Sequence, residues 1–182
     1  MKAKQLKEQI DIPENVQIEV DGHLIKVKGP LGESQKKLVN PKIKFSKEDK
    51  KFLIVSSEAT KREKTIIKTF KAHVKNLIKG VMENYTYKLK VCTAHFPVDL
   101  SINDNILIIK NFLGERKPRT AKIISGVDVK IDNDILTVSG INKEDVGQTS
   151  ATIEQTCKIT NRDRRVFQDG IFITEKDGKM LR

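Results

Sequence analysis

The alternation of apolar and polar residues predicts short strands in the first half of the chain. Apolar side chains alternate with polar ones over residues 16–20, and the dipeptide Asp21-Gly22 leads into a second apolar segment over residues 24–28. Two such segments joined by an Asp-Gly turn are typical of a β-hairpin. Another apolar segment over residues 51–56 predicts a further strand.

A helix is predicted after this strand. Thr60 and Glu63 have the spacing of a capping box, in which each side chain satisfies a free backbone donor at the start of a helix. Apolar residues then recur on one helical face, which we expect to pack on a sheet. They are Ile67, Phe70, Val74, Leu77 and Ile78. Gly80 is the expected end of this helix.

The same order of signals returns about 82 residues later. The tripeptide Leu-Gly-Glu at residues 31–33 recurs at residues 113–115. Asn142 and Asp145 stand 82 residues after Thr60 and Glu63, and Asn caps a helix as well as Thr does. We therefore interpret the chain as an internal duplication.

The remaining elements of the second copy follow the same plan. Alternation over residues 98–102, a turn and an apolar segment over residues 106–110 predict a second hairpin. Residues 135–139 predict a strand before the second helix, which is expected to end near Asn161.

The expected fold class is therefore α+β, with two tandem copies of a small unit of antiparallel strands covered by one helix. We place the first, Lys-rich repeat at residues 1–82 and the second, with the arginine clusters, at residues 83–182. Tyr85, Tyr87 and Leu89 alternate with polar residues, which predicts the first strand of the second repeat.

The chain is strongly basic, and the two kinds of basic residue are separated along it. Its 35 Lys and Arg against 24 Asp and Glu give a net charge of +11, which indicates an anionic partner. Residues 1–90 carry 21 − 11 = +10, and 20 of these 21 basic residues are Lys. Residues 91–182 carry only 14 − 13 = +1 but hold six of the seven arginines. Because Arg binds phosphate oxygens bidentately, we expect the specific contacts in the second half.

Several classes of protein are excluded by what the sequence lacks. The longest aliphatic or aromatic runs, residues 52–55 and 106–109, have four residues, too few to cross a bilayer. Residues 1–10 contain no apolar segment of the kind a secretory signal needs, so a cytoplasmic protein without a membrane partner is expected. Cys92 and Cys157 have no metal-ligand spacing and are interpreted as reduced, with no metal site.

The sequence also gives no sign of catalysis. His23, His73 and His95 are scattered and are interpreted as structural residues. No phosphate-binding loop or nucleophile elbow is present, and the acidic pairs fall at expected turns and helix starts. We therefore expect neither an enzyme nor a cofactor.

The candidate RNA-binding residues lie in two arginine clusters and near the end of the chain. They are Arg116, Lys117, Arg119, Arg162, Arg164 and Arg165, with Lys176 and Lys179 in support. Only 5% of the residues are aromatic, so contacts to phosphate and sugar are expected rather than base stacking on a sheet.

Residues just after the second cluster have structural interpretations. We expect Phe167, Ile171 and Phe172 to be core residues of a strand. Asp169-Gly170 is interpreted as a turn rather than a metal site.

Six ordered segments along nearly the whole chain carry characteristic motifs. They lie at residues 11–16, 27–32, 77–81, 94–97, 111–115 and 155–172. The most specific is the late segment from Gln155 to Phe172. Together these segments resemble the large-subunit ribosomal protein L-six family, in its archaeal and eukaryotic branch.

The resemblance implies a two-domain structural protein of the cytoplasmic large ribosomal subunit. It implies binding to large-subunit ribosomal RNA mainly through the second domain, with neighbouring ribosomal proteins and with translation factors acting nearby. The bacterial branch has a Tyr-Lys-Gly-Lys-Gly segment where this chain has residues 165–172. RNA contacts of that bacterial segment are therefore not carried over.

Two other functions remain open from the sequence. The chain could be a free RNA chaperone or an RNA-binding regulator that acts away from the ribosome. An RNA-modifying enzyme is the least favoured alternative, because it would need a cofactor loop or catalytic cluster that the sequence lacks. Whether the Lys-rich first repeat faces RNA or protein is left open by its charge.

Overall fold

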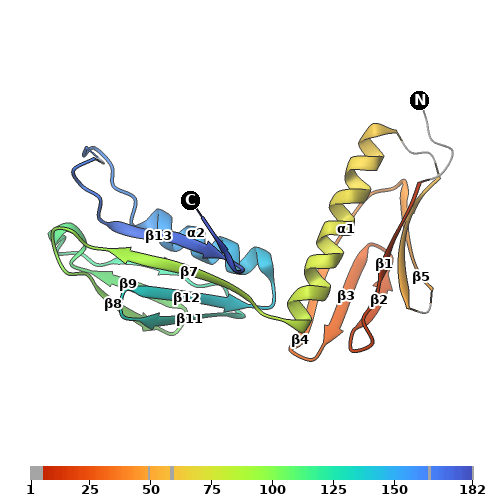
Figure 1. The fold of residues 1–182 in the computed structure, drawn as a ribbon, viewed down its shortest axis with the longest axis horizontal. Coiled ribbons are helices and arrows are strands. Elements are labelled where there is room, and N and C mark those ends of the chain that lie inside the picture. The colour runs from red at the N-terminus through yellow and green to blue at the C-terminus, as the bar shows by residue number, and fades with distance from the viewer. Residues whose placement is uncertain (1–5, 49, 58–59, 164, 182) are drawn as a thin grey trace. The chain divides into compact units, whose positions relative to one another are not determined.

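The computed structural model divides the chain into two compact units, Met1–Asn84 and Tyr85–Arg182 (Figure 1). It describes residues 6–48, 50–57, 60–163 and 165–181. The division falls two residues after the boundary that the repeat pattern predicted.

In the described residues of the first unit, six strands form two antiparallel sheets beside one long helix. Its elements are β1 Leu6–Asp11, β2 Gln17–Asp21, β3 Leu24–Gly29, β4 Gly32–Lys37, β5 Ile43–Glu48, β6 Lys51–Ser56 and α1 Lys61–Met82. The strand orders are β1-β6-β5 and β2-β3-β4. Helix α1 contacts strands of both sheets, so it closes the core between them (Figure 1).

Strand β6 is buried on both of its faces, which explains its continuous apolar sequence. Phe52, Leu53 and Ile54 are all buried, although successive side chains point to opposite faces. From α1, Ile67 and Val74 are fully buried. Burial of each such side chain stabilises the folded state by about 1.5–3 kcal/mol relative to leaving it exposed.

The second unit repeats this plan and adds two strands. Its elements are β7 Tyr85–Cys92, β8 Asp99–Asn103, β9 Ile106–Lys110, the 3-10 turn η1 Phe112–Gly114, β10 Arg119–Lys122, β11 Val127–Asp132, β12 Ile135–Gly140, α2 Lys143–Thr156, β13 Gly170–Lys176 and β14 Lys179–Met180. The sheets are β10-β9-β8 and β11-β12-β7-β13-β14. Strand β13 pairs with the side of β7 that faces away from β12.

The two units therefore share one topology, and the predicted α+β fold of two tandem copies is confirmed. Strands β2 and β3 begin 82 residues before β8 and β9, and α1 begins 82 residues before α2. The predicted strand at Tyr85 is also present, as β7.

Both helix ends differ from the prediction for tertiary reasons. Helix α1 continues past Gly80 to Met82, because Gly80 is a buried packing residue rather than a stop signal. Helix α2 ends at Thr156, five residues before Asn161. Its last carbonyl accepts a hydrogen bond from the side chain of Arg119, which replaces a further helical turn.

Both helices begin with the predicted caps. In α1 the backbone N–H of Thr60 donates to Glu63 Oε2 at 2.9 Å, and the Thr60 hydroxyl donates to the same oxygen. In α2 the backbone N–H of Glu144 donates to Asn142 Oδ1 at 3.1 Å. The bonds from Thr60, with the charge of Lys42 near the carboxylate, lower the pKa of Glu63 to about 2.

A close approach between Gly29 and Val81 ties the end of α1 to the β3–β4 turn. A Cβ atom at Gly29 would lie 2.7 Å from Val81 Cγ2 and 2.9 Å from its carbonyl oxygen. That oxygen also accepts a hydrogen bond from the backbone N–H of Leu31 at 3.1 Å, so it cannot withdraw freely. The first glycine of the Gly-Pro-Leu-Gly segment is therefore needed for packing.

We predict that Gly29→Ala destabilises the first unit by about 1–3 kcal/mol, because the added methyl group overlaps backbone as well as side chain. Urea denaturation of the full chain measures the change. Gly147→Ala in α2 is the matched control, since a Cβ there would meet only Tyr87 Cε2 at 3.9 Å. It should be neutral or gain up to about 1 kcal/mol of helix propensity. Equal destabilisation in both variants would contradict the packing explanation.

We also predict that the stabilising effect of the Glu63 charge depends on pH. The folded state lowers the pKa of Glu63 from 4.5 to about 2, so its contribution is complete above pH 4.5 and disappears as the pH falls towards 2. Wild type should exceed Glu63→Gln in urea midpoint at pH 7, and the difference should shrink steadily below pH 4.5. A difference independent of pH would show that the charge is not responsible.

Candidate nucleic-acid interface

The two arginine clusters lie at the same end of the second unit. Arg119 at the start of β10 donates from Nη1 to the carbonyl oxygens of Thr156 at 2.8 Å and Lys158 at 3.3 Å. These carbonyls are at the end of α2, where the loop with the second cluster begins. One side chain thus connects the loop of Arg116 to the loop of Arg162.

The contacts of Arg119 give it a structural role. Its Nε and Nη2 donate to the two carboxylate oxygens of Glu115 at 2.8 and 2.6 Å, and its guanidinium lies 4.5 Å from the centre of the Phe112 ring. The hydrogen bonds from Arg119 lower the pKa of Glu115 against the effect of burial, and the nearby charge of Arg162 lowers it further. Every guanidinium nitrogen of Arg119 has an intramolecular partner, so the geometry favours positioning over phosphate binding.

Arg116 and Lys117 are free to meet a ligand. Both are exposed in the turn after η1. Neither makes a hydrogen bond or ion pair to another residue that the structure describes. Two exposed cations beside the fixed side chain of Arg119 are suited to phosphate binding.

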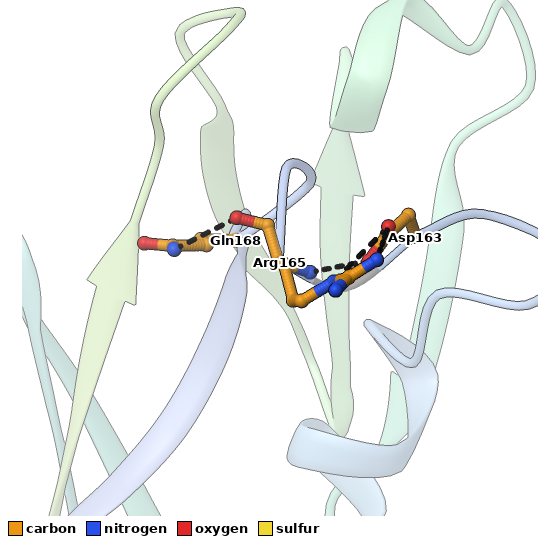
Figure 2. Close-up of polar contacts among 3 residues, drawn as sticks. All are labelled: Asp163, Arg165 and Gln168. Atoms are coloured by element: carbon orange, nitrogen blue, oxygen red, sulfur yellow. Dashed lines mark hydrogen bonds and ion pairs between the residues drawn. The ribbon is translucent and has the colours of Figure 1, made fainter.

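The second cluster is held by local contacts that a ligand can replace. Arg165 donates from Nη2 to Asp163 Oδ2 at 2.7 Å, and its carbonyl accepts a hydrogen bond from the side chain of Gln168 at 3.1 Å (Figure 2). Its side chain is 90% exposed, so solvent screens this pair and a phosphate can compete with Asp163. Arg164, the third arginine of the cluster, lies outside the described residues.

An aromatic stack supports the loop that carries these arginines. Arg162 lies 4.9 Å from the centre of the Phe167 ring, which stacks on His95 with centroids 5.0 Å apart. The sequence did not place these three residues together, although His95 and Phe167 both lie in segments of the family resemblance. His95 has the structural role expected for it.

The buried carboxylate of Asp169 holds the base of this loop. Its Oδ1 accepts the backbone N–H groups of Ala94 at 2.7 Å and His95 at 3.1 Å, and its Oδ2 lies 2.5 Å from His95 Nδ1. Burial would raise the pKa of Asp169, but the hydrogen bonds from His95 and Ala94 outweigh it and lower the pKa. The prediction of a turn at Asp169-Gly170 is wrong, because partners 74 and 75 residues away fix Asp169 and Gly170 begins β13.

The prediction of three strand core residues is correct only for Ile171. Ile171 is 2% exposed, whereas Phe172, the next residue of β13, is 38% exposed on the other face. Phe167 lies in the loop before β13 and is half-buried by its stack. Two aromatic rings therefore border the surface near the second cluster.

Lys176 and Lys179 lie at the opposite end of the sheet. They are register partners in the hairpin of β13 and β14, near the start of β7. Like charges directly opposite each other repel, and a bound anion would relieve that repulsion. The predicted residues thus form two separate basic sites, one with the arginine clusters and one with these lysines.

Other chemistry is sparse in the part of the chain that the structure describes. Cys92 and Cys157 are free thiols, and burial raises the pKa of Cys157 to about 11. Among the described residues, no three His, Cys, Asp or Glu side chains are grouped so as to hold a metal ion. No described helix is both long and apolar enough to cross a membrane.

Comparison with known proteins identifies close relatives of the whole chain. A family model described as ribosomal protein L6 matches residues 12–84 and 96–170, one match in each unit. The large ribosomal subunit protein uL6 of Methanococcus vannielii is 45% identical over 179 residues, which cover 98% of both chains. That of Methanobrevibacter smithii is 42% identical over 175 residues, 96% of this chain and 98% of the relative.

We predict that Arg119→Ala lowers the free energy of unfolding by about 1–3 kcal/mol, because it leaves the Glu115 carboxylate and the end of α2 without their donor. Arg116→Ala should change it by less than about 0.5 kcal/mol. Urea denaturation and hydrogen exchange of the α2 amides measure both. Arg119→Lys should not restore stability, since one ammonium cannot reproduce the planar fork. Similar destabilisation by Arg116→Ala and Arg119→Ala would show that the bonds of Arg119 to Glu115 and Thr156 do not stabilise the unit.

Proposed function

We propose a function for this chain, which belongs to the ribosomal protein L6 family. The proposal is that it is a structural component of the large ribosomal subunit, as the names of its relatives state for them. The agreement extends over 98% of the chain and includes both units. The family consists of ribosomal proteins rather than enzymes, which agrees with the expectation that the chain has no catalytic function.

The proposed activity is binding of large-subunit ribosomal RNA through the second unit. The observation that carries it is that Arg119 joins the loop of Arg116 and Lys117 to the end of α2, where the loop of Arg162 and Arg165 begins. Exposed cations on two connected loops can contact adjacent phosphates of a folded RNA. Arg164 belongs to the proposed surface by its place in the sequence.

The internal contacts of the loops favour recognition of RNA shape. Arg119 and Asp169 each fix a loop through backbone partners on another element. Cations held at fixed separations select phosphates at matching separations, whereas flexible lysines bind anions with little selectivity. Lys176 and Lys179 would support this contact at a second point on the unit.

The environment of the protein on the ribosome is also part of the proposal. The family resemblance supports a location near the region where translation factors act, with ribosomal proteins as neighbours. The first unit has 19 basic and 11 acidic residues, a net of +8, and its lysines can face RNA or protein.

The alternative is a free RNA chaperone or an RNA-binding regulator. Sedimentation in sucrose gradients at high salt separates the two functions. A subunit component stays with the large subunit, whereas a free regulator remains at the top of the gradient.

We predict that Arg116→Gln combined with Lys117→Gln weakens binding to deproteinised large-subunit ribosomal RNA by about 1–3 kcal/mol for each charge-assisted bond to phosphate that is removed. The slope of log affinity against log salt should fall by about 0.7–0.9 for each of these phosphate contacts. Filter binding at several salt concentrations measures both quantities.

The matched control is Lys122→Gln combined with Lys130→Gln, which removes two charges from β10 and β11. It should change affinity and slope much less than the Arg116 and Lys117 double variant. Equal effects of the two double variants would mean that net charge alone governs binding, and the proposed surface would be wrong.

A further inference from the structure

A groove of about 910 Å³ runs beside the proposed RNA-binding surface. Its lining comes from β7 and the loop after it, the turn between β11 and β12, the end of α2, the loop before β13 and the first residues of β13. Phe167 and Phe172 both line it, so it connects the stack under Arg162 to the exposed ring on β13. Grooves of about 300–1,000 Å³ are large enough for a small ligand or one unit of a polymer.

The register of the sheet places an exposed ring beside an exposed cation. Phe172 on β13 is the partner of Lys90 on β7, and Lys90 is the partner of Ile135 on β12. Such neighbours are about 4.5–5.5 Å apart between Cβ atoms. All three are exposed, with Phe172 at 38% and Ile135 at 45%. The outer face of the sheet therefore presents an aromatic ring, an ammonium and an apolar side chain in one row.

Gly170 lets the Phe172 ring occupy its position. A Cβ atom at Gly170 would lie 2.8 Å from Cζ and 3.0 Å from Cε2 of that ring. The ring thus rests against the strand backbone two residues earlier. This contact explains the glycine of the Asp169-Gly170 dipeptide, which the turn interpretation did not.

The charges around the groove favour an anion. Lys90 and Lys158 line it, and the loop with Arg162 adjoins it. Carboxylates line it as well, and two of them are already engaged by backbone donors. Asp169 accepts the backbone bonds described above, and Glu154 accepts the backbone N–H of Ile173 at 3.2 Å.

The remaining carboxylate of the groove belongs to Asp134, which is exposed. Solvent screens an exposed carboxylate, so it opposes a bound anion only weakly.

We infer that this row binds one unstacked RNA nucleotide, whose base stacks on Phe172 while its phosphate meets Lys90. Every base has a flat face, and base stacking on aromatic side chains with cations along the backbone is the usual way to hold single-stranded RNA. The inference rests on the proposed RNA binding. It extends that proposal, because it adds a base contact to a surface otherwise expected to contact only phosphate and sugar.

The test compares two substitutions at one position in the full chain. Phe172→Leu keeps an apolar side chain but removes the flat ring, and Phe172→Tyr keeps the ring. With deproteinised large-subunit ribosomal RNA as the probe, Phe172→Leu should weaken binding about tenfold or more, and Phe172→Tyr should bind within about twofold of wild type. The salt slope should be unchanged in both, whereas Lys90→Gln should lower it by about 0.7.

Two results would overturn the inference and leave the proposed function standing. In the first, Phe172→Leu binds as wild type does while the Arg116 and Lys117 double variant is weakened. In the second, Phe172→Leu and Phe172→Tyr reduce affinity equally, so the ring itself is not the contact. If neither the double variant nor Phe172→Leu is weakened, the proposed RNA binding fails together with the inference.

A second measurement identifies what occupies the row in the assembled particle. Phe172 is replaced by a photoreactive benzoyl-phenylalanine in cells, and large subunits are purified and irradiated. A cross-link to a ribosomal RNA nucleotide in an unpaired segment is expected. A cross-link to another ribosomal protein would overturn the inference, because it would show that the face is a protein contact.

Discussion

The guanidinium of Arg119 is the contact on which the proposed RNA-binding end of the second unit depends. It joins Glu115 in the turn after η1 to the carbonyl of Thr156 at the end of α2, and it lies over the ring of Phe112. Its donors form a rigid fork, so one side chain can satisfy a carboxylate and a helix end at once. The loops of both arginine clusters start from the elements that it joins. Removing Arg119 would therefore remove a link between the two loops as well as one positive charge.

The two units show how one architecture comes to carry different surfaces. Both begin their helix at the same point of the repeat, yet the chain leaves the first unit two residues after α1. After α2 it turns back and adds β13 to the free side of β7. The added strand supplies Ile171 to the core and Phe172 to the outer face. Most of the surface proposed for RNA therefore lies on the loop and strand that have no counterpart among the described elements of the first unit.

The features that could be predicted from the sequence are those decided by neighbouring residues. The hairpins, the caps at Thr60 and Asn142 and the repeat itself depend on patterns within a few residues. The role of Arg119 could not be predicted, because Arg116 has the same chemistry and the carbonyls that Arg119 contacts belong to residues 37 and 39 positions later. The prediction for Asp169 was wrong for the same reason, since its partners are 74 and 75 residues earlier. Tertiary partners overrode a local turn signal in that case.

The separation of net charge from arginine has a physical consequence for binding. Attraction between exposed charges is screened over about 8 Å at physiological salt, so the +8 of residues 1–84 can raise the rate of encounter with RNA but cannot select an orientation. Selection needs charges held at fixed positions, and residues 85–182 supply these with a net charge of only 16 − 13 = +3. The acidic residues of the second unit help to hold these charges in position. Glu115, Asp163 and Asp169 lower its net charge, yet each one orients a basic side chain. A unit that is nearly neutral by count can therefore carry the more specific contact.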